Sequence, residues 1–354
     1  LLIMSEAALS YPRFSEIVRT FAPGWFAAVM GTGVLSLATL GLSARWAFLS
    51  PLAWGLHYFN LALFVLLAIP WLGRWLVYRE AALGTLRHPV QASFYPTFSI
   101  GMLVIASQFL AFGPSLELAL LFWWPGALLT FLFSFAVLFT MFSGDHVGIE
   151  HVTPAKFIPA VGLVVIPVAG GHLLGHVQGA MREWIMLIDL LGLGAGMVMY
   201  LGLLSLPLQR KYLAKPAFGI LTPTVWIHVA PLAVIPVSLL NVVEQLPFPV
   251  PSGVALLIGL LLWSFGVWWL VMAVLLTLAA RRRKMLPFAL SWWGFTFPLG
   301  IFVVCSLRLA KLSSIGMIAQ IGLLAWLLLL LLWSLALINT VRGVVSGDVF
   351  RPHP

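Results

Sequence analysis

The stretch FAPGWFAAVMGTGVLSLATLG at residues 21–41 decides the fold class. It carries no charged residue, and as a helix rising about 1.5 Å per residue it can cross the roughly 30 Å hydrocarbon core of a bilayer. It does not alternate polar and apolar residues, as a strand of a membrane barrel does. Similar apolar runs make ten spans in all, at about 23–41, 51–73, 91–112, 116–142, 153–174, 184–208, 217–243, 252–280, 286–307 and 316–341. The sequence therefore predicts an all-α integral membrane protein.

The overall composition supports a polytopic membrane protein. Of 354 residues, 62% are hydrophobic and only 8% are charged, whereas soluble domains are about 25% charged. The single cysteine, Cys305, excludes a disulfide framework and a cysteine metal cluster. No phosphate-binding glycine-rich loop and no metal-ligand helix pair stands out, and His172 and His176 lie near an outer loop. We therefore expect neither an enzyme nor a bound cofactor.

The positive charges segregate to one side of the predicted spans. Fifteen of the 19 Lys and Arg residues lie in the two terminal segments and in the connections on their side, the exceptions being Arg45, Arg182, Arg308 and Lys311. Because cytoplasmic loops are rich in Lys and Arg, we expect a multi-pass cell-membrane protein with both termini cytoplasmic. The expected division is a segment at 1–22, a membrane domain at 23–341 and a tail at 342–354. The basic run at 281–284 favours anionic lipid over nucleic acid as its partner.

A proline marks the start of every odd-numbered span, at Pro23, Pro89, Pro154, Pro216 and Pro287. The odd spans also hold further Pro and Gly residues, whereas the even spans are rich in Leu. Internal prolines kink helices, and the backbone groups they free cannot face lipid. The alternative is that these residues are simply common in membrane helices. The pattern predicts five hairpins (about 23–73, 91–142, 153–208, 217–280 and 286–341), each with a kinked inner and a straight outer helix, around a central channel.

The odd spans contain no acidic side chain, which argues against a pathway for cations or protons. His228 is the one histidine deep in an odd span, as a hydrogen-bonded core residue or as a substrate contact. The other histidines on or near the inner helices lie in or beside loops, which disfavours a haem between two helices. A sensor scaffold that transports nothing is a further alternative. It is disfavoured, because we expect no soluble domain that could receive a signal. No lysine or arginine lies deep in an odd span.

Three segments carry a resemblance to a known family: FAPGWFAAVMGTGVLS (21–36), HVTPAKFIPAVGLVVIP (151–167) and SWWGFTFPLGIFVV (291–304). They resemble the tellurite-resistance/dicarboxylate transporter family, which includes a bacterial tellurite-resistance protein, yeast malate and sulfite transporters and the slow anion channel of plant guard cells. The resemblance implies a quasi-fivefold ring of helical hairpins with a pore in each subunit of a homotrimer. It also implies that a phenylalanine directly before a proline on the ninth span plugs this pore.

That phenylalanine corresponds to Phe297, with Phe295 as the alternative on another helix face. The resemblance thus implies a transmembrane channel or transporter for small inorganic or organic anions, with an apolar pore gated by a phenylalanine. The alternative is a proton-coupled carrier of malate-like four-carbon dicarboxylates, or an exporter of sulfite or tellurite-related oxyanions, for which His228 is the one candidate contact in the path. The expected pore-lining or kink residues are Gly31, Thr32, Gly33, Pro96, Pro159, Pro223, His228 and Pro298.

Overall fold

The computed structural model describes residues 11–113, 115–144, 153–213 and 219–351, and these residues form helices joined by short connections without strands. Ten helical stretches of this part of the chain are long and apolar enough to cross a membrane, from Pro23–Ser43 to Gly316–Ser346. The expected all-helical class and the expected number of spans are therefore confirmed.

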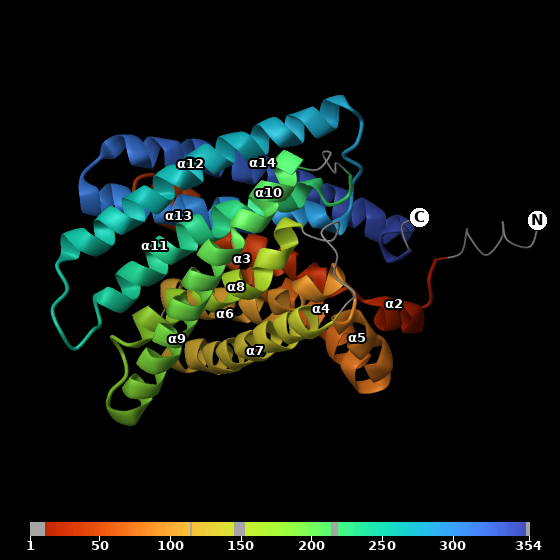
Figure 1. Cartoon of the computed structure of the whole chain (residues 1–354), viewed down its shortest axis with the longest axis horizontal. Helices are drawn as coiled ribbons and strands as arrows, with labels where there is room; N and C mark the ends of the chain where they lie inside the picture. Colours follow the sequence, from red (N-terminus) through yellow and green to blue (C-terminus); the bar gives the residue numbers. More distant parts are fainter. Residues whose placement is uncertain (1–10, 114, 145–152, 214–218, 352–354) are drawn as a thin grey trace, which may run out of the picture.

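Each odd-numbered span begins with a 3-10 turn and continues as an α-helix (Figure 1). The pairs are η1 (Pro23–Phe26) with α3 (Ala27–Ser43), η3 (Gln91–Phe94) with α6 (Pro96–Ala111), η5 (Pro154–Phe157) with α8 (Ile158–Leu173), η6 (Thr222–His228) with α11 (Val229–Val243), and η7 (Leu290–Phe295) with α13 (Thr296–Ser313). Several of the prolines lie at these starts, because a first helical turn leaves its N–H groups unbonded and a missing one costs nothing there. Pro167 and Pro236 do lie inside α8 and α11.

The even-numbered spans are longer and more exposed. They are η2 (Ala47–Leu49) with α4 (Ser50–Val77), α7 (Leu116–Ser143), α9 (Gly179–Leu203) with α10 (Ser205–Leu213), α12 (Ser252–Arg282) and α14 (Gly316–Ser346). Their most apolar windows are 28–39% buried, against 67–94% for the odd spans. We therefore call the odd-numbered spans inner and the even-numbered spans outer.

Each inner helix packs against the outer helix that follows it in the chain, and the inner helices also pack against one another. Helix α6 contacts α3 and α8, α11 contacts α8 and α13, and α13 contacts α3. Every one of these five helices therefore has two other inner helices as neighbours. Close approach within a pair uses glycine: a Cβ atom on Gly196 of α9 would lie 2.8 Å from the carbonyl oxygen of Ala160 and 2.9 Å from the backbone nitrogen of Val164.

Buried polar groups join outer helices to inner ones. In α4, Asn60 Nδ2 donates to Gln108 Oε1 at 2.9 Å, and Gln108 Nε2 donates to Ser36 Oγ at 2.6 Å. Tryptophan indole N–H groups of outer helices make the same kind of link, in the pairs Trp123 with Ile166 O, Trp263 with Ser306, Trp269 with Val225 O, Trp326 with Thr39 and Trp333 with Thr32. Such bonds fix how far each hairpin is rotated, because an unpaired polar group is expensive in an apolar interior.

Three short elements lie at one end of the bundle: α2 (Phe14–Thr20), α5 (Arg79–Leu86) and η8 (Asp348–Phe350) (Figure 1). The Phe350 ring lies 5.7 Å from that of Trp25 and 6.3 Å from that of Tyr11, centroid to centroid. The first and last described residues therefore meet at the same end, as an even number of spans requires. We call it the terminal end.

Candidate functional site

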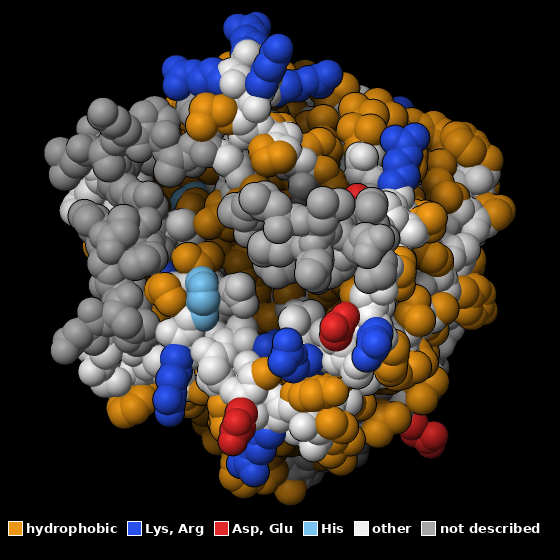
Figure 2. Space-filling view, turned by 90° about the vertical axis from the view of Figure 1, so that its right-hand side faces the viewer, with side chains coloured by type: hydrophobic (Ala, Val, Ile, Leu, Met, Phe, Trp, Pro, Cys, Tyr) orange, Lys and Arg blue, Asp and Glu red, His pale blue; other side chains and the backbone are white. Residues whose placement is uncertain are grey.

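A cavity of about 1030 Å³, here called the vestibule, lies at the terminal end of the bundle. Figure 2 shows that face as a hollow with hydrophobic side chains inside and Lys and Arg side chains around it. All five inner spans contribute to the wall. One turn apart along each span, they supply a shallow set (Ala27, Thr97, Ile158, Ile227, Gly294) and a deeper set (Met30, Ile100, Val161, Ala230, Phe297). The vestibule is thus bounded by equivalent turns of five helices.

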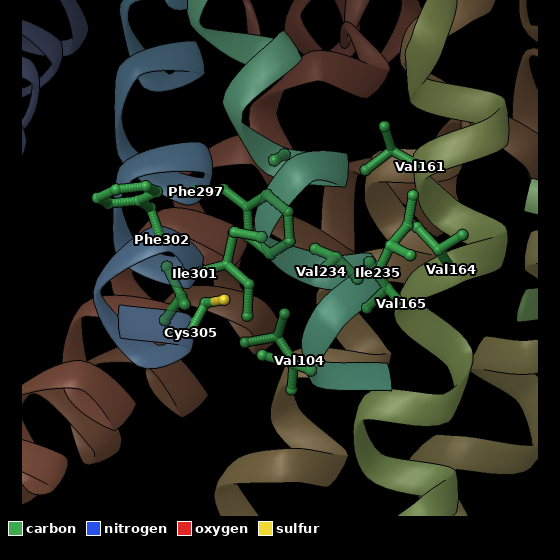
Figure 3. Close-up of a cluster of buried hydrophobic side chains, with 14 of the residues drawn as sticks. Val104, Val161, Val164, Val165, Val234, Ile235, Phe297, Ile301, Phe302 and Cys305 are labelled. Atoms are coloured by element: carbon green, nitrogen blue, oxygen red, sulfur yellow. The ribbon is translucent and has the colours of Figure 1, made fainter. Parts of the chain in front are cut away.

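Beyond the deeper set, the interior is packed with apolar side chains. Four residues further along each inner helix stand five β-branched residues, Val34, Val104, Val165, Val234 and Ile301, all buried and none of them in the vestibule wall. Figure 3 shows the Phe297 ring reaching from its helix into the cluster formed with Val104, Val234 and Ile301. The vestibule therefore ends at the level of Phe297.

The structure separates the two phenylalanines that the sequence left as alternatives. Phe297 and the following Pro298 belong to the vestibule wall, and 5% of Phe297 is exposed. Phe295 is 1% exposed and faces away from the vestibule, with its ring in edge contacts 5.3 Å from Trp226 and 5.7 Å from Trp292. Phe297 thus has the position that a plug requires, and Phe295 has that of a core residue.

In the MGTG segment, Met30 lines the vestibule, whereas Gly31, Thr32 and Gly33 lie at contacts between helices rather than in its wall. Gly31 packs directly against the side chain of Thr296 on α13. Thr32 accepts a hydrogen bond from the Trp333 indole at 2.9 Å. A Cβ atom on Gly33 would lie 2.7 Å from Asn60 Nδ2. These residues allow α3 to approach its neighbours closely. Gly31 makes its close contact with Thr296, the residue directly before Phe297.

The other sequence-predicted residues also lie outside the vestibule wall. Pro96 and Pro159 are buried in the first turns of α6 and α8, and Pro223 is buried at the start of η6. His228 is fully buried, with its ring 4.6 Å from that of Phe157 and 4.3 Å from that of Trp269. The histidine therefore faces η5 and the outer helix α12.

A buried arginine in the vestibule wall, Arg74, belongs to the outer helix α4. Arg74 of α4 is 5% exposed; its Nη1 donates to Phe21 O at 2.7 Å, and its Nη2 donates to Ala81 O at 3.0 Å and to Thr85 Oγ1 at 2.6 Å. Our search of the inner spans missed this residue. The available signal was an arginine within the apolar run WLGRWLV at 71–77, where the helix continues past the expected end of the span.

Comparison with known proteins places the whole membrane domain in one family. The family model described as a voltage-dependent anion channel (SLAC1) matches residues 20–341. An uncharacterized transporter of Methanocaldococcus jannaschii is 39% identical over 338 residues, which cover 96% of this chain and 97% of the relative. A sulfite efflux pump of Trichophyton rubrum is 24% identical, over 94% of this chain and 93% of the pump.

A malic acid transport protein of Schizosaccharomyces pombe is 22% identical, over 96% of this chain and 82% of the transport protein. The matches extend over nearly the full membrane domain, so they concern the same ten spans described above and not an isolated motif. The resemblance carried by the three segments is confirmed, and the chain belongs to the voltage-dependent anion channel family, a family of membrane transporters and channels rather than enzymes.

Proposed function

We propose that this chain forms a gated membrane pathway for small anions, with the five hairpins arranged as a ring around a pore and Phe297 as the gate. One observation carries the proposal: the vestibule ends at a level to which each inner span contributes one residue, and Phe297 is the bulkiest of the five. A phenyl ring in a narrow apolar passage blocks water and ions by its size and by dewetting. The ring of β-branched residues beyond it continues the apolar passage.

The inner helices supply the preference for anions. All five inner spans begin at the vestibule, so the positive ends of their helix dipoles lie around it. Such helix starts favour negative charge without a fixed cation in the passage. Among the described residues that line the vestibule, Asp348 is the one acidic residue. This arrangement disfavours cations, which need carboxylate or carbonyl oxygens along their path.

The vestibule is proposed to face the cytoplasm, because the terminal end carries most of the chain's Lys and Arg residues. Assembly as a homotrimer with one pore per subunit is proposed from the family resemblance. The mass of the purified complex, measured by light scattering with a correction for bound detergent, tests the trimer. A mass of one or two chains contradicts it.

A carrier of organic acids or sulfite is the second candidate. Two relatives are named for malic acid transport and sulfite efflux, and Arg74 gives the vestibule the cationic side chain that such a carrier needs. Counterflow of labelled malate or sulfite separates the two: a carrier exchanges labelled for unlabelled substrate faster than it mediates net flux, whereas a channel does not.

The gate is tested by electrical recording of the reconstituted protein. Under a potassium chloride gradient, we expect currents that reverse near the chloride potential, and larger currents for Phe297→Ala than for wild type. A current that reverses near the potassium potential contradicts the anion pathway. A Phe297→Ala variant that is folded but conducts no more than wild type contradicts the gate. Phe302→Ala, which removes a buried ring of the same helix outside the vestibule wall, is the matched control.

A further inference from the structure

We propose that the vestibule contains a binding site for a small oxyanion or carboxylate, formed by Arg74 in its wall with Arg19 and Arg342 at its rim. The inference deepens the proposed function and rests on it for the direction in which the anion moves. The site itself rests on charge, burial and hydrogen bonding in the described part of the chain, argued below.

The first step is that the positive charge of Arg74 is not neutralised. Its three hydrogen-bond acceptors are two backbone carbonyls and a hydroxyl group, all uncharged. Its Nε atom is buried without a hydrogen-bond partner among the described residues. A guanidinium has five N–H donors, and a buried donor without a partner costs free energy. An anion in the vestibule would offset the charge of Arg74.

The second step is the charge of the surrounding wall. Besides Arg74, the described lining includes Arg19, Arg342, Arg351 and Asp348. Arg351 Nη1 lies 3.3 Å from Asp348 Oδ1, so these two charges offset each other. Three arginines without a carboxylate partner in the described residues remain around one cavity. Apolar walls of low dielectric strengthen the field of such a cluster and raise the local anion concentration.

The third step concerns which anion fits. The planar guanidinium fork matches carboxylate and oxyanion geometry better than an ammonium group does. The amide side chain of Gln91 in the wall can donate further hydrogen bonds. A volume of about 1030 Å³ is far larger than such an ion, so the anion remains partly hydrated. The site is therefore suited to weak, rapidly exchanging occupancy.

Arg74 also has a structural role that the experiment must separate from binding. Its bonds to Phe21 O and Ala81 O connect α4 to the start of η1 and to α5. A neutral replacement removes both the charge and these bonds, whereas Arg74→Lys keeps the charge. Arg342 is exposed on α14 and lines the same vestibule, so Arg342→Gln changes the charge without disturbing a buried side chain.

The test uses a single reactive thiol in the vestibule, at Asn339→Cys. The one native cysteine, Cys305, is fully buried and does not compete. The full-length protein in phosphatidylcholine nanodiscs reacts with a negatively charged sulfonatoethyl or a positively charged trimethylammonioethyl methanethiosulfonate. We expect the negative reagent to be favoured. Removing one positive charge should shift the two rates in opposite directions, by roughly threefold for a charge that lies about 7 Å from the thiol in water.

Arg74→Gln and Arg342→Gln should both produce this shift, and Arg74→Lys should retain the wild-type ratio. Arg282→Gln, at the same end but outside the vestibule wall, should leave the ratio unchanged. Malate and sulfite, each added at constant ionic strength, should protect the thiol saturably, with protection weakened by Arg74→Gln. Unchanged rates in both glutamine variants overturn the site. Protection that rises without saturation, or that appears only after anionic lipid is added, also overturns it. These rates need no conduction, so the site can fail or hold independently of the proposed pathway.

Discussion

Replacing Phe297 and Phe295 by alanine in parallel distinguishes a gate from a core residue. Both rings are nearly inaccessible and only two positions apart, but Phe297 borders the vestibule and Phe295 packs between two tryptophans. We expect Phe297→Ala to raise anion flux at a small cost in stability. We expect Phe295→Ala to leave flux per folded molecule unchanged or lower, at a large cost in stability.

The two costs follow from what each ring leaves behind. Deleting a buried phenyl ring costs about 3–5 kcal/mol. Part of this cost comes from the cavity left behind, at about 24 cal/mol per Å³. For a ring of about 100 Å³, the cavity therefore accounts for about 2 kcal/mol. At Phe297 the new space joins a vestibule of about 1030 Å³, so the cavity term largely disappears and about 2 kcal/mol remains. At Phe295 the cavity term stays, and two aromatic contacts worth about 0.5–1.5 kcal/mol each are lost as well. The difference is about 3–5 kcal/mol.

The assay is the thermal unfolding midpoint of each purified variant, paired with chloride efflux from proteoliposomes normalised to folded protein. At roughly 2 °C per kcal/mol for a chain of this size, the Phe295→Ala midpoint should lie about 6–10 °C below that of Phe297→Ala. Equal midpoints would show that the Phe297 ring is packed as fully as a core residue. Higher flux in Phe295→Ala with unchanged flux in Phe297→Ala would assign the plug to the other helix face and refute the reasoning.

Three further predictions concern packing, polar links and orientation. Gly196→Ala should lower the unfolding midpoint, because the added methyl group meets the backbone of α8 within 3 Å and overpacking costs about 1–3 kcal/mol. Gly194 faces open space, so Gly194→Ala should be neutral. Equal midpoints for the two variants contradict this prediction. Gln108→Leu should cost about 1–3 kcal/mol, measured in the same way, because it leaves the buried Asn60 Nδ2 group without its partner, and a neutral effect would mean that water replaces the bond. In whole cells, an impermeant thiol reagent should label Gln178→Cys and spare Arg87→Cys; the reverse pattern places the vestibule outside.

Hydropathy alone predicted the number of spans correctly, because the thickness of the bilayer fixes how long each apolar run must be. The positions of the connections between the spans followed from the same apolar runs. The division into inner and outer spans was visible as well, since Pro and Gly mark the inner ones and Leu the outer ones. The 3-10 turns at the start of the inner spans were not predicted. Pro96, Pro159 and Pro223 were interpreted as kinks further inside their spans, whereas they lie in the first turns of α6, α8 and η6.

The face that each inner helix presents to the vestibule could not be predicted. In the span Thr222–Val243, 94% of the most apolar window is buried, so no polar side distinguishes one face from another. This difficulty is illustrated by three residues that we expected in the pore lining, Gly31, Thr32 and His228. In the structure, all three contact neighbouring helices instead. Only the contacts between helices fix this rotation. The resemblance chose Phe297 over Phe295, a choice that the residues alone left open.

Arg74 lies where a fixed charge can favour anions without trapping them. Two opposite unit charges 4 Å apart attract by about 1 kcal/mol in water and by about 4 kcal/mol where the effective dielectric constant is about 20. A cation at the level of Phe297, among buried valines, would thus slow the exit of an anion by roughly a thousandfold, and fast passage needs weak binding. Arg74 comes from an outer helix and reaches the vestibule near its mouth, while the inner helices supply apolar side chains at the narrow level. The inner-span residues at the narrow level include no cation, which is therefore consistent with anion passage, provided that the outer helices carry the charge to the mouth.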